Sequence, residues 1–209
     1  MMLYTNTVDT KTLDLLKRLM ALPVLAKFAL VGGTNLSLQL GHRLSVDLDI
    51  FSNEDFIADE VLETVIQNFS SFELIRSSEK SFSGILENVK IDIILHKYDY
   101  LESVKVIDGI RLLSIPDIIP MKLNAMAQRG AKKDFWDIAE LLNHYSIEEM
   151  LSFFVRKYKN HDYGYIIHSL YYFDDAEIET DPIDLKGVTW QEVKAKIKKA
   201  TDEFVHRKL

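Results

Sequence analysis

The composition is that of an ordinary folded protein with an acidic balance. The 209 residues include 25 Lys plus Arg against 32 Asp plus Glu, giving a formal net charge of -7, and 47% of them are hydrophobic. No apolar run approaches the roughly 18 residues that cross a bilayer, and cysteine is absent, which excludes disulfides, thiolate zinc sites and cysteine nucleophiles. The acidic balance argues against a surface that coats nucleic acid throughout. The first residues carry no export pattern, so we expect a cytoplasmic protein that makes no membrane contact.

The first half of the chain mixes helix and strand patterns. Helices are predicted over 10–22, 34–40 and 55–69. Strands are predicted over 27–31, 46–51, 72–75, 81–86, 89–96, 104–107 and 110–113. Thr34 is expected to cap the second helix and Gly41 to end it. The dipeptides Glu87-Asn88 and Asp108-Gly109 predict hairpin turns.

Beyond Ser114 the pattern is helical only. Ser114 followed by Asp117 resembles a capping box, and Pro116 lies early in a helix, where its missing N–H is tolerated. Helices are predicted over 116–129, 132–145, 147–158, 162–173 and 189–207. We therefore predict an α+β protein, with a mixed sheet flanked by helices over 1–113 and a C-terminal helical part over 114–209.

Three aspartates interrupt apolar strand patterns. Asp47 and Asp49 would point to one face of their strand, with Cα atoms about 6.5–7 Å apart, while Val46 and the other apolar residues face the core. Two carboxylates about 4 Å apart repel by on the order of 4 kcal/mol at an effective dielectric of about 20, so a cation is expected between them. Asp92 lies inside another apolar strand and also needs a partner or a task. Together the three could hold one or two Mg²⁺ ions.

The pair Gly32-Gly33 lies between a predicted strand and the helix that follows. Backbone N–H groups at a helix start can cradle phosphate, and glycine lets the backbone approach a ligand closely. The pair alone is a weak signal. The Asp-x-Asp strand that begins fourteen residues after Gly33 makes it much stronger.

Four separated motifs resemble the nucleotidyltransferase AbiEii/AbiGii toxin family of abortive-infection and type IV toxin–antitoxin systems, within the polymerase-β-like superfamily. They are Gly32-Gly33, the segment 41–51 (GHRLSVDLDIF), the helical segment from Lys122 to Arg129, and the segment 133–142 (KDFWDIAELL). They agree with that family in order and spacing, and the resemblance covers about residues 20–145.

The resemblance implies a polymerase-β-like nucleotidyltransferase core and a role for each motif residue. Asp47 and Asp49 would be metal ligands, and Asp92 a third carboxylate that can serve as base for the incoming hydroxyl. Lys122 would contact the nucleotide phosphates, and Asp134 would support activity or nucleotide positioning. The remaining phosphate-binding residues would be Gly32, Gly33, Thr34, His42, Arg43 and Ser45.

Simpler interpretations stay open for these residues. The first two aspartates could form the acidic face of an exposed edge strand, and Asp92 could pair with Lys90. Lys122 could be a solvated helix lysine, and Asp134 and Asp137 could pair with Lys133 or Arg129 on the helix surface. The segment His42-Arg43 could cap the helix before it.

The predicted function is Mg²⁺-dependent transfer of a nucleoside monophosphate from an NTP to an acceptor hydroxyl. The resemblance implies a toxin encoded beside a cognate antitoxin, with an RNA acceptor such as the 3′ end of tRNA. Two alternatives remain: nucleotidylation of a protein or small molecule, and a catalytically silent module that binds a nucleotide or a partner. The presence of all three aspartates and of Lys122 argues against a silent module.

Overall fold

One mixed sheet forms the centre of the first half of the chain. The computed structural model describes residues 2–159 and 162–208. Its strands are β1 (Ala29–Val31), β2 (Leu48–Ser52), β3 (Glu73–Ser78), β4 (Ser81–Leu86), β5 (Val89–Leu95), β6 (Lys105–Ile107) and β7 (Ile110–Leu112). They lie in the order β3-β4-β5-β2-β1-β7-β6. The pairs β2–β5 and β1–β7 are parallel and the others antiparallel, so the predicted mixed sheet is confirmed.

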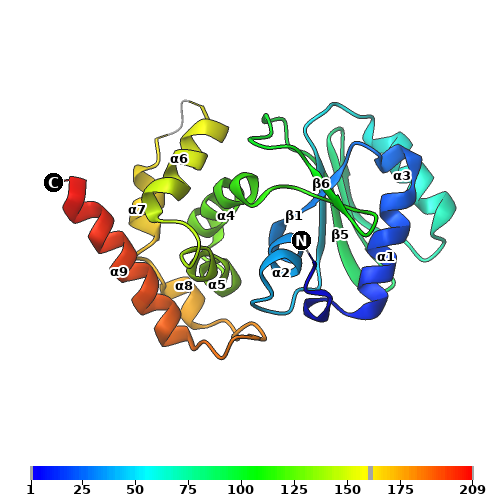
Figure 1. Ribbon diagram of the computed structural model, residues 1–209. Coiled ribbons are helices and arrows are strands. Elements are labelled where there is room, and N and C mark those ends of the chain that lie inside the picture. Colours follow the sequence, from blue (N-terminus) through cyan, green and yellow to red (C-terminus); the bar gives the residue numbers. More distant parts are fainter. Residues whose placement is uncertain (1, 160–161, 209) are drawn as a thin grey trace.

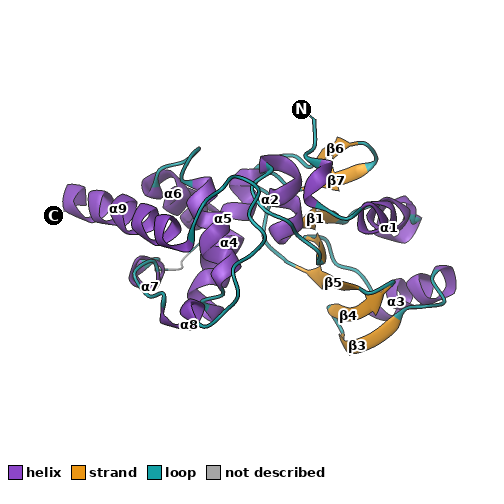
Figure 2. Cartoon of the chain, turned by 90° about the horizontal axis from the view of Figure 1, so that it is seen from below, coloured by secondary structure: helices purple, strands orange, loops and turns teal. Residues whose placement is uncertain are grey.

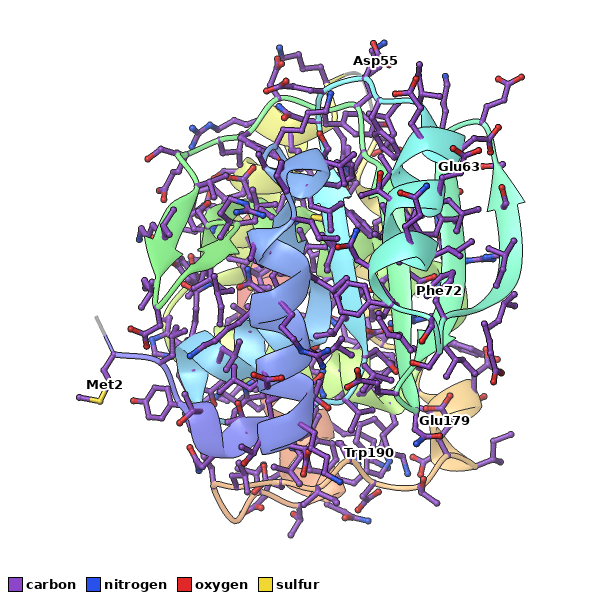
Figure 3. All side chains as sticks on the ribbon, turned by 90° about the vertical axis from the view of Figure 1, so that its right-hand side faces the viewer. Met2, Asp55, Glu63, Phe72, Glu179 and Trp190 are labelled. Atoms are coloured by element: carbon purple, nitrogen blue, oxygen red, sulfur yellow. The ribbon has the colours of Figure 1, made fainter. Side chains whose placement is uncertain are left out.

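Helices cover both faces of the sheet and continue beyond it. Helices α1 (Thr10–Ala21) and α3 (Ala58–Asn68) lie on one side, and α2 (Gly32–Leu40) lies on the other (Figure 1). Figure 3 views the first side, with α1 and α3 in front of the sheet and Glu63 on the outside of α3. The helical part contains α4 (Ile115–Arg129), α5 (Lys132–Leu141), α6 (Ile147–Lys157), α7 (Gly164–Ser169), α8 (Asp174–Glu177) and α9 (Trp190–Lys208). Seen from below, these helices gather on the far side of α2 from the sheet (Figure 2).

Helix α2 joins two hydrophobic clusters. One cluster packs the sheet against α1 and α3 and includes Leu38 of α2. The other holds the C-terminal helices together and includes Leu36 and Leu40 of the same helix. Helix α2 is therefore buried on both sides, and a residue placed at its start is held by both halves of the protein. The division into 1–113 and 114–209 stays a prediction.

Several local predictions are confirmed by the backbone. Gly41 ends α2 with a positive φ of 70°. Glu87 and Asn88 both have positive φ between β4 and β5, as do Asp108 and Gly109 between β6 and β7, which is the conformation that tight hairpin turns require. Ser114 caps α4 by accepting a hydrogen bond from the Asp117 N–H.

The start of α2 and the start of β2 differ from the predictions. Helix α2 begins at Gly32 rather than at Thr34, because Gly32 adopts a φ of 70° and turns the chain directly from β1 into the helix. Strand β2 begins at Leu48, and Val46 is 65% exposed instead of facing the core. The segment before β2 is not part of the sheet. It is bound to the N-terminal segment, because the Ser45 N–H donates to the Thr7 carbonyl.

The helix predicted over 162–173 is too long. Only α7 lies within this range, and α8 begins after it, at Asp174. Turn hydrogen bonds from Tyr171 N–H to His168 and from Tyr172 N–H to Ser169 close the end of α7 and interrupt the helical ladder. None of the described helices has the length and apolarity that a membrane crossing requires.

Candidate active site

A narrow polar pocket of about 100 Å³ lies between β2, β5, the start of α2 and helices α4 and α5. It is lined by Gly33, Arg43, Ser45, Asp47, Asp49, Lys90, Asp92, Lys122, Arg129 and Lys133. Most of the predicted site residues therefore meet in one place, although they come from separate motifs. Basic side chains surround the three carboxylates, which makes the pocket suited to an anion held close to acidic groups.

Asp49 and Asp92 lie directly opposite each other on the parallel strands β2 and β5. Among the described residues, Asp49 has no hydrogen-bond or ion-pair partner. Burial raises the pKa of Asp49, and the charges of Asp92 and Asp47 add to this effect against the opposing charge of Lys122. Asp49 is therefore a largely buried acid that lacks a counter-charge in direct contact.

The other two pocket aspartates are each paired with a lysine. The Lys90 ammonium donates to Asp92 at 2.7 Å, and the Ser83 hydroxyl donates to the other oxygen of the same carboxylate. Against the effect of burial, these hydrogen bonds lower the pKa of Asp92. Lys133 lies 3.3 Å from Asp47. The structure thus contains the Asp92–Lys90 ion pair that the simpler interpretation of Asp92 predicted, and this pair lies inside the pocket.

The three pocket carboxylates are suited to binding a divalent cation only in part. No group of three or more His, Cys, Asp or Glu side chains in the described ranges is arranged to hold a metal ion. The chemistry of the donors nevertheless fits, because carboxylate oxygens suit Mg²⁺, Asp49 has no other partner, and one or two carboxylates suffice when substrate phosphates complete the coordination. Assignment of Asp47, Asp49 and Asp92 to a metal stays a prediction.

Both positions of the first motif require glycine, because other side chains lie very close to the backbone there. A Cβ atom at Gly32 would collide with the Asp49 carboxylate, and one at Gly33 would collide with the Arg43 guanidinium. Within the described part of the chain, no side chain caps the first turn of α2. The backbone N–H groups of that turn therefore stay available beside the pocket, as a phosphate site at a helix start requires.

Thr34 and Ser45 fix the loop that carries Asp47. The Thr34 hydroxyl donates to Ser45 Oγ at 2.9 Å and also bonds the Asp47 carbonyl oxygen. Ser45 lines the pocket and Thr34 does not. Thr34 thus holds the segment between α2 and β2 in place, which is a different task from the predicted helix cap.

Asp137 connects the loop after α2 to helix α4. Its carboxylate accepts from Arg43 Nε and Nη2 at 2.7 and 2.9 Å, and Lys122 Nζ lies 2.6 Å away. The side chain is completely buried. Burial opposes ionisation, but the charges of Arg43 and Lys122 hold the pKa of Asp137 well below its usual range. The sequence favoured a functional role for Asp134 over Asp137, which lies three residues further along the last motif.

Asp134 is also fully buried and holds two basic residues of α4. Arg129 Nε donates to it at 2.7 Å and Lys122 Nζ at 3.2 Å. Asp134 is not among the residues that line the pocket. It does pair with a basic neighbour, but in the interior and not on the helix surface. The interpretation of Lys122 as a solvated lysine is wrong, because its side chain is 6% exposed.

His42 lies outside this pocket. Its Nε2 is 2.7 Å from Asp137, and it lines a different cavity. The segment that carries His42 pairs with a distant part of the chain: the Leu44 N–H donates to the Ile183 carbonyl and the Leu185 N–H to the His42 carbonyl, both at 2.9 Å. No sequence signal pointed to this contact, which fixes the loop beside the pocket.

Comparisons with known sequences agree with the motif resemblance. A family model described as nucleotidyl transferase AbiEii toxin, type IV TA system, matches residues 14–206. An uncharacterized protein of Aquifex aeolicus (strain VF5) is 30% identical over 197 residues, covering 92% of this chain and 95% of that protein. The family match reaches well beyond the 20–145 that the motifs cover and includes the C-terminal helices.

Solved structures share the fold at low sequence identity. JHP933 from Helicobacter pylori has a TM-score of 0.59 at 19% identity, covering 97% of this chain and 94% of that one. The nucleotidyltransferase toxin MenT4 from Mycobacterium tuberculosis H37Rv has a TM-score of 0.55 at 15% identity, covering 92% and 84% of the two chains. The predicted nucleotidyltransferase fold is confirmed.

Proposed function

Because the chain belongs to the nucleotidyl transferase AbiEii toxin family of type IV toxin–antitoxin systems and is therefore a nucleotidyltransferase, we propose that it transfers a nucleoside monophosphate from an NTP to a hydroxyl of RNA. The 3′ end of tRNA is the first acceptor to test. The observation that supports this proposal best is the unpaired Asp49 facing Asp92, in a pocket that five basic side chains also line.

The triphosphate would bind at the start of α2. The free N–H groups of the first helical turn and the Arg43 guanidinium supply donors there, and Lys122 adds a buried positive charge. Guanidinium forks and ammonium groups both bind phosphate oxygens well. Asp137 keeps Arg43 and Lys122 in fixed positions, so little ordering of these two side chains would accompany nucleotide binding.

Asp47 and Asp49 would hold Mg²⁺, which would neutralise charge on the phosphates and on the departing pyrophosphate. In the structure, Lys133 pairs with Asp47 and Lys90 pairs with Asp92. Both ammonium groups are partly exposed and belong to flexible side chains. We expect them to leave these carboxylates when substrate is present and to contact its phosphates instead.

Asp92 would accept the proton of the acceptor hydroxyl. An aspartate carboxylate is ionised at neutral pH, as a proton acceptor must be, and the Ser83 hydroxyl, which donates to Asp92, favours the charged form. The hydroxyl oxygen forms a bond to the α-phosphorus while the bond from that phosphorus to the bridging oxygen breaks. The electron pair leaves with pyrophosphate, and the proton passes to Asp92.

The type IV family also implies a cognate antitoxin as a partner. Two alternatives for the acceptor remain to be separated from RNA: a protein side chain and a small molecule. Each would leave the roles of Asp49, Asp92 and Lys122 unchanged, because the chemistry at phosphorus is the same. The silent-module alternative predicts nucleotide binding without transfer.

A labelling experiment tests the proposal. The protein is incubated with Mg²⁺, each α-labelled NTP in turn, and total RNA or cell extract. We expect label in RNA with the wild type and none with the Asp47→Asn, Asp49→Asn double variant. The matched control is Asp55→Asn, which removes an exposed carboxylate outside the pocket. Label in protein would contradict the RNA acceptor, and bound nucleotide without label anywhere would contradict the enzyme.

A further inference from the structure

A row of polar side chains crosses the sheet from its edge to the catalytic pocket. The strand register pairs Arg76 of β3 with Ser83 of β4, and Ser83 with Asp92 of β5. Asp92 in turn faces Asp49 of β2. Side chains paired directly across neighbouring strands lie on one face of the sheet. The two carboxylates line the pocket, and Arg76 lies at the other end of the row, on the edge strand. The transfer chemistry proposed above gives Arg76 no task.

A shift in the pairing of β3 with β4 places Arg76 on this face. Leu74 is paired with Gly84. Arg76 comes two residues later but is paired with Ser83, only one position away. In an unshifted strand alternate residues share a face, so Arg76 would lie on the face of Leu74 and Gly84. The shift moves it to the opposite face, which carries Ser83 and Asp92. Irregularities of this kind occur beside active sites, where they redirect a side chain.

Hydrogen bonds hold the Arg76 guanidinium beside Asp92 and leave part of it open to solvent. Its Nε donates to Ser83 Oγ at 3.0 Å, and the Ser83 hydroxyl donates to Asp92. Nη2 lies 3.7 Å from the Asp92 carboxylate, which is too far for a direct hydrogen bond. The side chain is 70% exposed, and no described residue accepts a hydrogen bond from its two Nη nitrogens. Ser83 thus orients the guanidinium, and the outer nitrogens can bind an anion as arginine forks bind phosphate.

The geometry of phosphoryl transfer places the acceptor on the side of Arg76. The attacking oxygen and the departing pyrophosphate lie roughly in line, on opposite sides of the phosphorus. The triphosphate site proposed above lies at Gly32, where β1 passes into α2. From there the strands follow in the order β1, β2, β5, β4 and β3, so the two pocket carboxylates lie between the start of α2 and Arg76 (Figure 2). With the pyrophosphate toward β1, the hydroxyl reaches the phosphorus from the side of β4 and β3.

We propose that an acceptor RNA strand crosses β4 and β3, and that Arg76 binds a phosphodiester group close to its reacting hydroxyl. This contact rests on the proposed transfer to RNA, and it identifies the surface that receives the acceptor. Charge complementarity supports an RNA strand, because a second cation on this face, Lys90, is 48% exposed and belongs to the strand of Asp92. A protein side chain or an unphosphorylated small molecule has no anionic group that would occupy the guanidinium.

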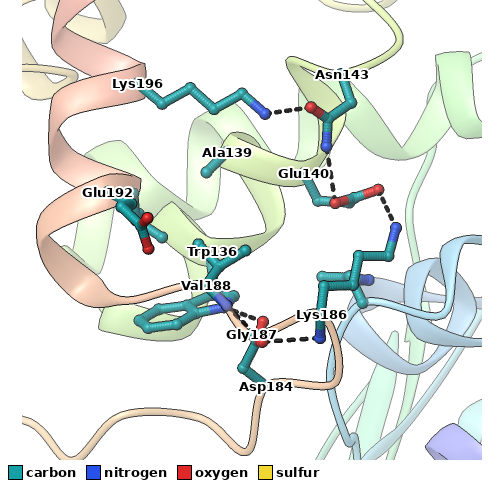
Figure 4. Close-up of a pocket in the computed structure, with 12 residues that line it drawn as sticks. Trp136, Ala139, Glu140, Asn143, Asp184, Lys186, Gly187, Val188, Glu192 and Lys196 are labelled. Carbon is teal, nitrogen blue, oxygen red and sulfur yellow. Dashed lines mark hydrogen bonds and ion pairs between the residues drawn. The ribbon is translucent and has the colours of Figure 1, made fainter.

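The cavity of about 390 Å³ between α5, α9 and the segment 184–188 gives the acceptor no comparable route (Figure 4). Asn143 and Lys186 at its wall both donate to the Glu140 carboxylate, at 3.0 and 2.6 Å. These polar groups are therefore engaged with one another. The described residues that line this cavity also differ from those that line the catalytic pocket. A hydroxyl bound there would be separated from Asp92.

Steady-state kinetics of the full chain test the contact. The assay uses Mg²⁺, an α-labelled NTP and the RNA that accepts label in the experiment described above. We expect Arg76→Gln to raise the KM for RNA at least about 10-fold and to change the KM for NTP by less than about 2-fold, because a charge-assisted hydrogen bond is lost only from the acceptor. Arg76→Lys keeps the charge without the fork and should lie between the two proteins. The matched control Arg156→Gln removes an exposed arginine of α6 and should leave both KM values unchanged.

Synthetic 3′ segments joined to the same RNA identify the phosphate. One of the last three linkages at a time carries an uncharged methylphosphonate, and a 2′-O-methyl group on the adjoining ribose prevents strand cleavage. The phosphodiester control carries the same methyl group. At one linkage the KM of the wild type for RNA should rise about as much as it does in Arg76→Gln, and Arg76→Gln should lose nothing further there. Independent, additive losses at every linkage would overturn the contact.

The remaining outcomes separate this contact from the proposed function. A fall in kcat with an unchanged KM for RNA would make Arg76 a support of Asp92 through Ser83 and overturn the phosphate contact. Label in RNA with equal KM values in wild type and both Arg76 variants would also overturn it, and would leave the transfer reaction standing. Label in protein would overturn both. Thermal melts establish that the variants are folded, and if Arg76→Gln does not fold, the linkage comparison is made with Arg76→Lys, which should show a smaller loss than wild type at the same linkage.

Discussion

The Lys122 ammonium lies 2.6 Å from the Asp137 carboxylate, and both side chains are buried between α4 and α5. Arg43 binds the same carboxylate with two nitrogens from the loop after α2. One acidic side chain therefore positions two of the basic groups that line the catalytic pocket. Its loss would leave both of them buried without their main counter-charge.

Asp137→Asn should therefore be strongly destabilising as well as inactive. Breaking a buried ion pair by removing one partner costs about 3–5 kcal/mol, which at about 2–4 °C per kcal/mol lowers Tm by at least roughly 6 °C. Thermal melts measure this. The control Asp14→Asn removes an exposed partner of Arg18 and should change Tm by little. An active Asp137→Asn protein with an unchanged Tm would contradict the role assigned to this residue.

Local sequence pattern was sufficient to predict much of the pocket. Gly33, Arg43 and Asp49 belong to continuous motifs in which a turn, a loop and a strand follow each other closely. Pairing of β2 with β5 then brings Asp92 opposite Asp49, because residues of one strand face share a side of the sheet. The apolar patterns of the two strands predict which face of the sheet each aspartate is on. That β5 contributes the third carboxylate was inferred only from the order of the strands along the chain.

Long-range contacts could not be predicted in this way. Asp137 and Arg43 are 94 residues apart, and nothing in either motif specifies that their side chains meet. The segment 183–185 pairs with the loop at His42 through backbone groups, which carry no sequence signal. Val46 fits the alternation of a strand, but its two neighbours are held outside the strand by hydrogen bonds to Thr34 and Thr7. Sequence periodicity does not reveal such contacts.

Mg²⁺ should stabilise the wild-type protein through Asp49. The pKa of Asp49 is raised, so its charged form is disfavoured in the folded state. Stability associated with this group is lost as pH rises through its folded pKa and stays lost at neutral pH. A bound cation reverses this effect, and we expect millimolar Mg²⁺ to raise Tm at pH 7.

The Asp49→Asn variant separates this effect from general salt stabilisation. Without the charge, the variant should melt at a higher temperature than wild type in the absence of Mg²⁺ and should lose the response to Mg²⁺. Asp55→Asn, an exposed carboxylate change, should keep the wild-type response. An equal Mg²⁺ shift in all three proteins would show that Asp49 does not hold the ion.

Gly32→Ala should abolish transfer at a modest cost in stability. Alanine in the left-handed conformation costs about 1–2 kcal/mol, and the added Cβ would displace the Asp49 carboxylate. Gly109→Ala is a matched control, because Gly109 has a similar φ of 79° but nothing within 4 Å of an added Cβ. Both variants should lose comparable stability in chemical denaturation, and only Gly32→Ala should lose activity. Loss of activity in both would assign the effect to backbone strain alone.

Lys133→Met should raise the KM for NTP without unfolding the protein. Its pair with Asp47 is partly exposed, so its removal should change the free energy of unfolding by less than about 1 kcal/mol. A lost charge-assisted hydrogen bond to phosphate is worth about 1.5–3 kcal/mol, or roughly a 10- to 100-fold rise in KM. Lys97→Met removes a similar exposed lysine–aspartate pair outside the pocket and should leave KM unchanged. An unchanged KM in Lys133→Met would place its ammonium away from the substrate.

His96 should make the protein less stable in mild acid. Burial, with the charge of Lys157, lowers the pKa of His96 to about 4 from an ordinary value of 6.5. Between these two values the unfolded chain binds a proton that the folded protein does not, so stability falls as pH decreases from 6.5 to 4. The loss is at most about 3.5 kcal/mol, from about 1.4 kcal/mol for each pKa unit. His96→Phe keeps an aromatic ring against Phe51 and Tyr98 but cannot titrate. Urea denaturation at pH 7 and pH 5 should show a clear decrease for wild type and a smaller one for the variant, whereas parallel decreases in both proteins would assign the acid sensitivity to other groups.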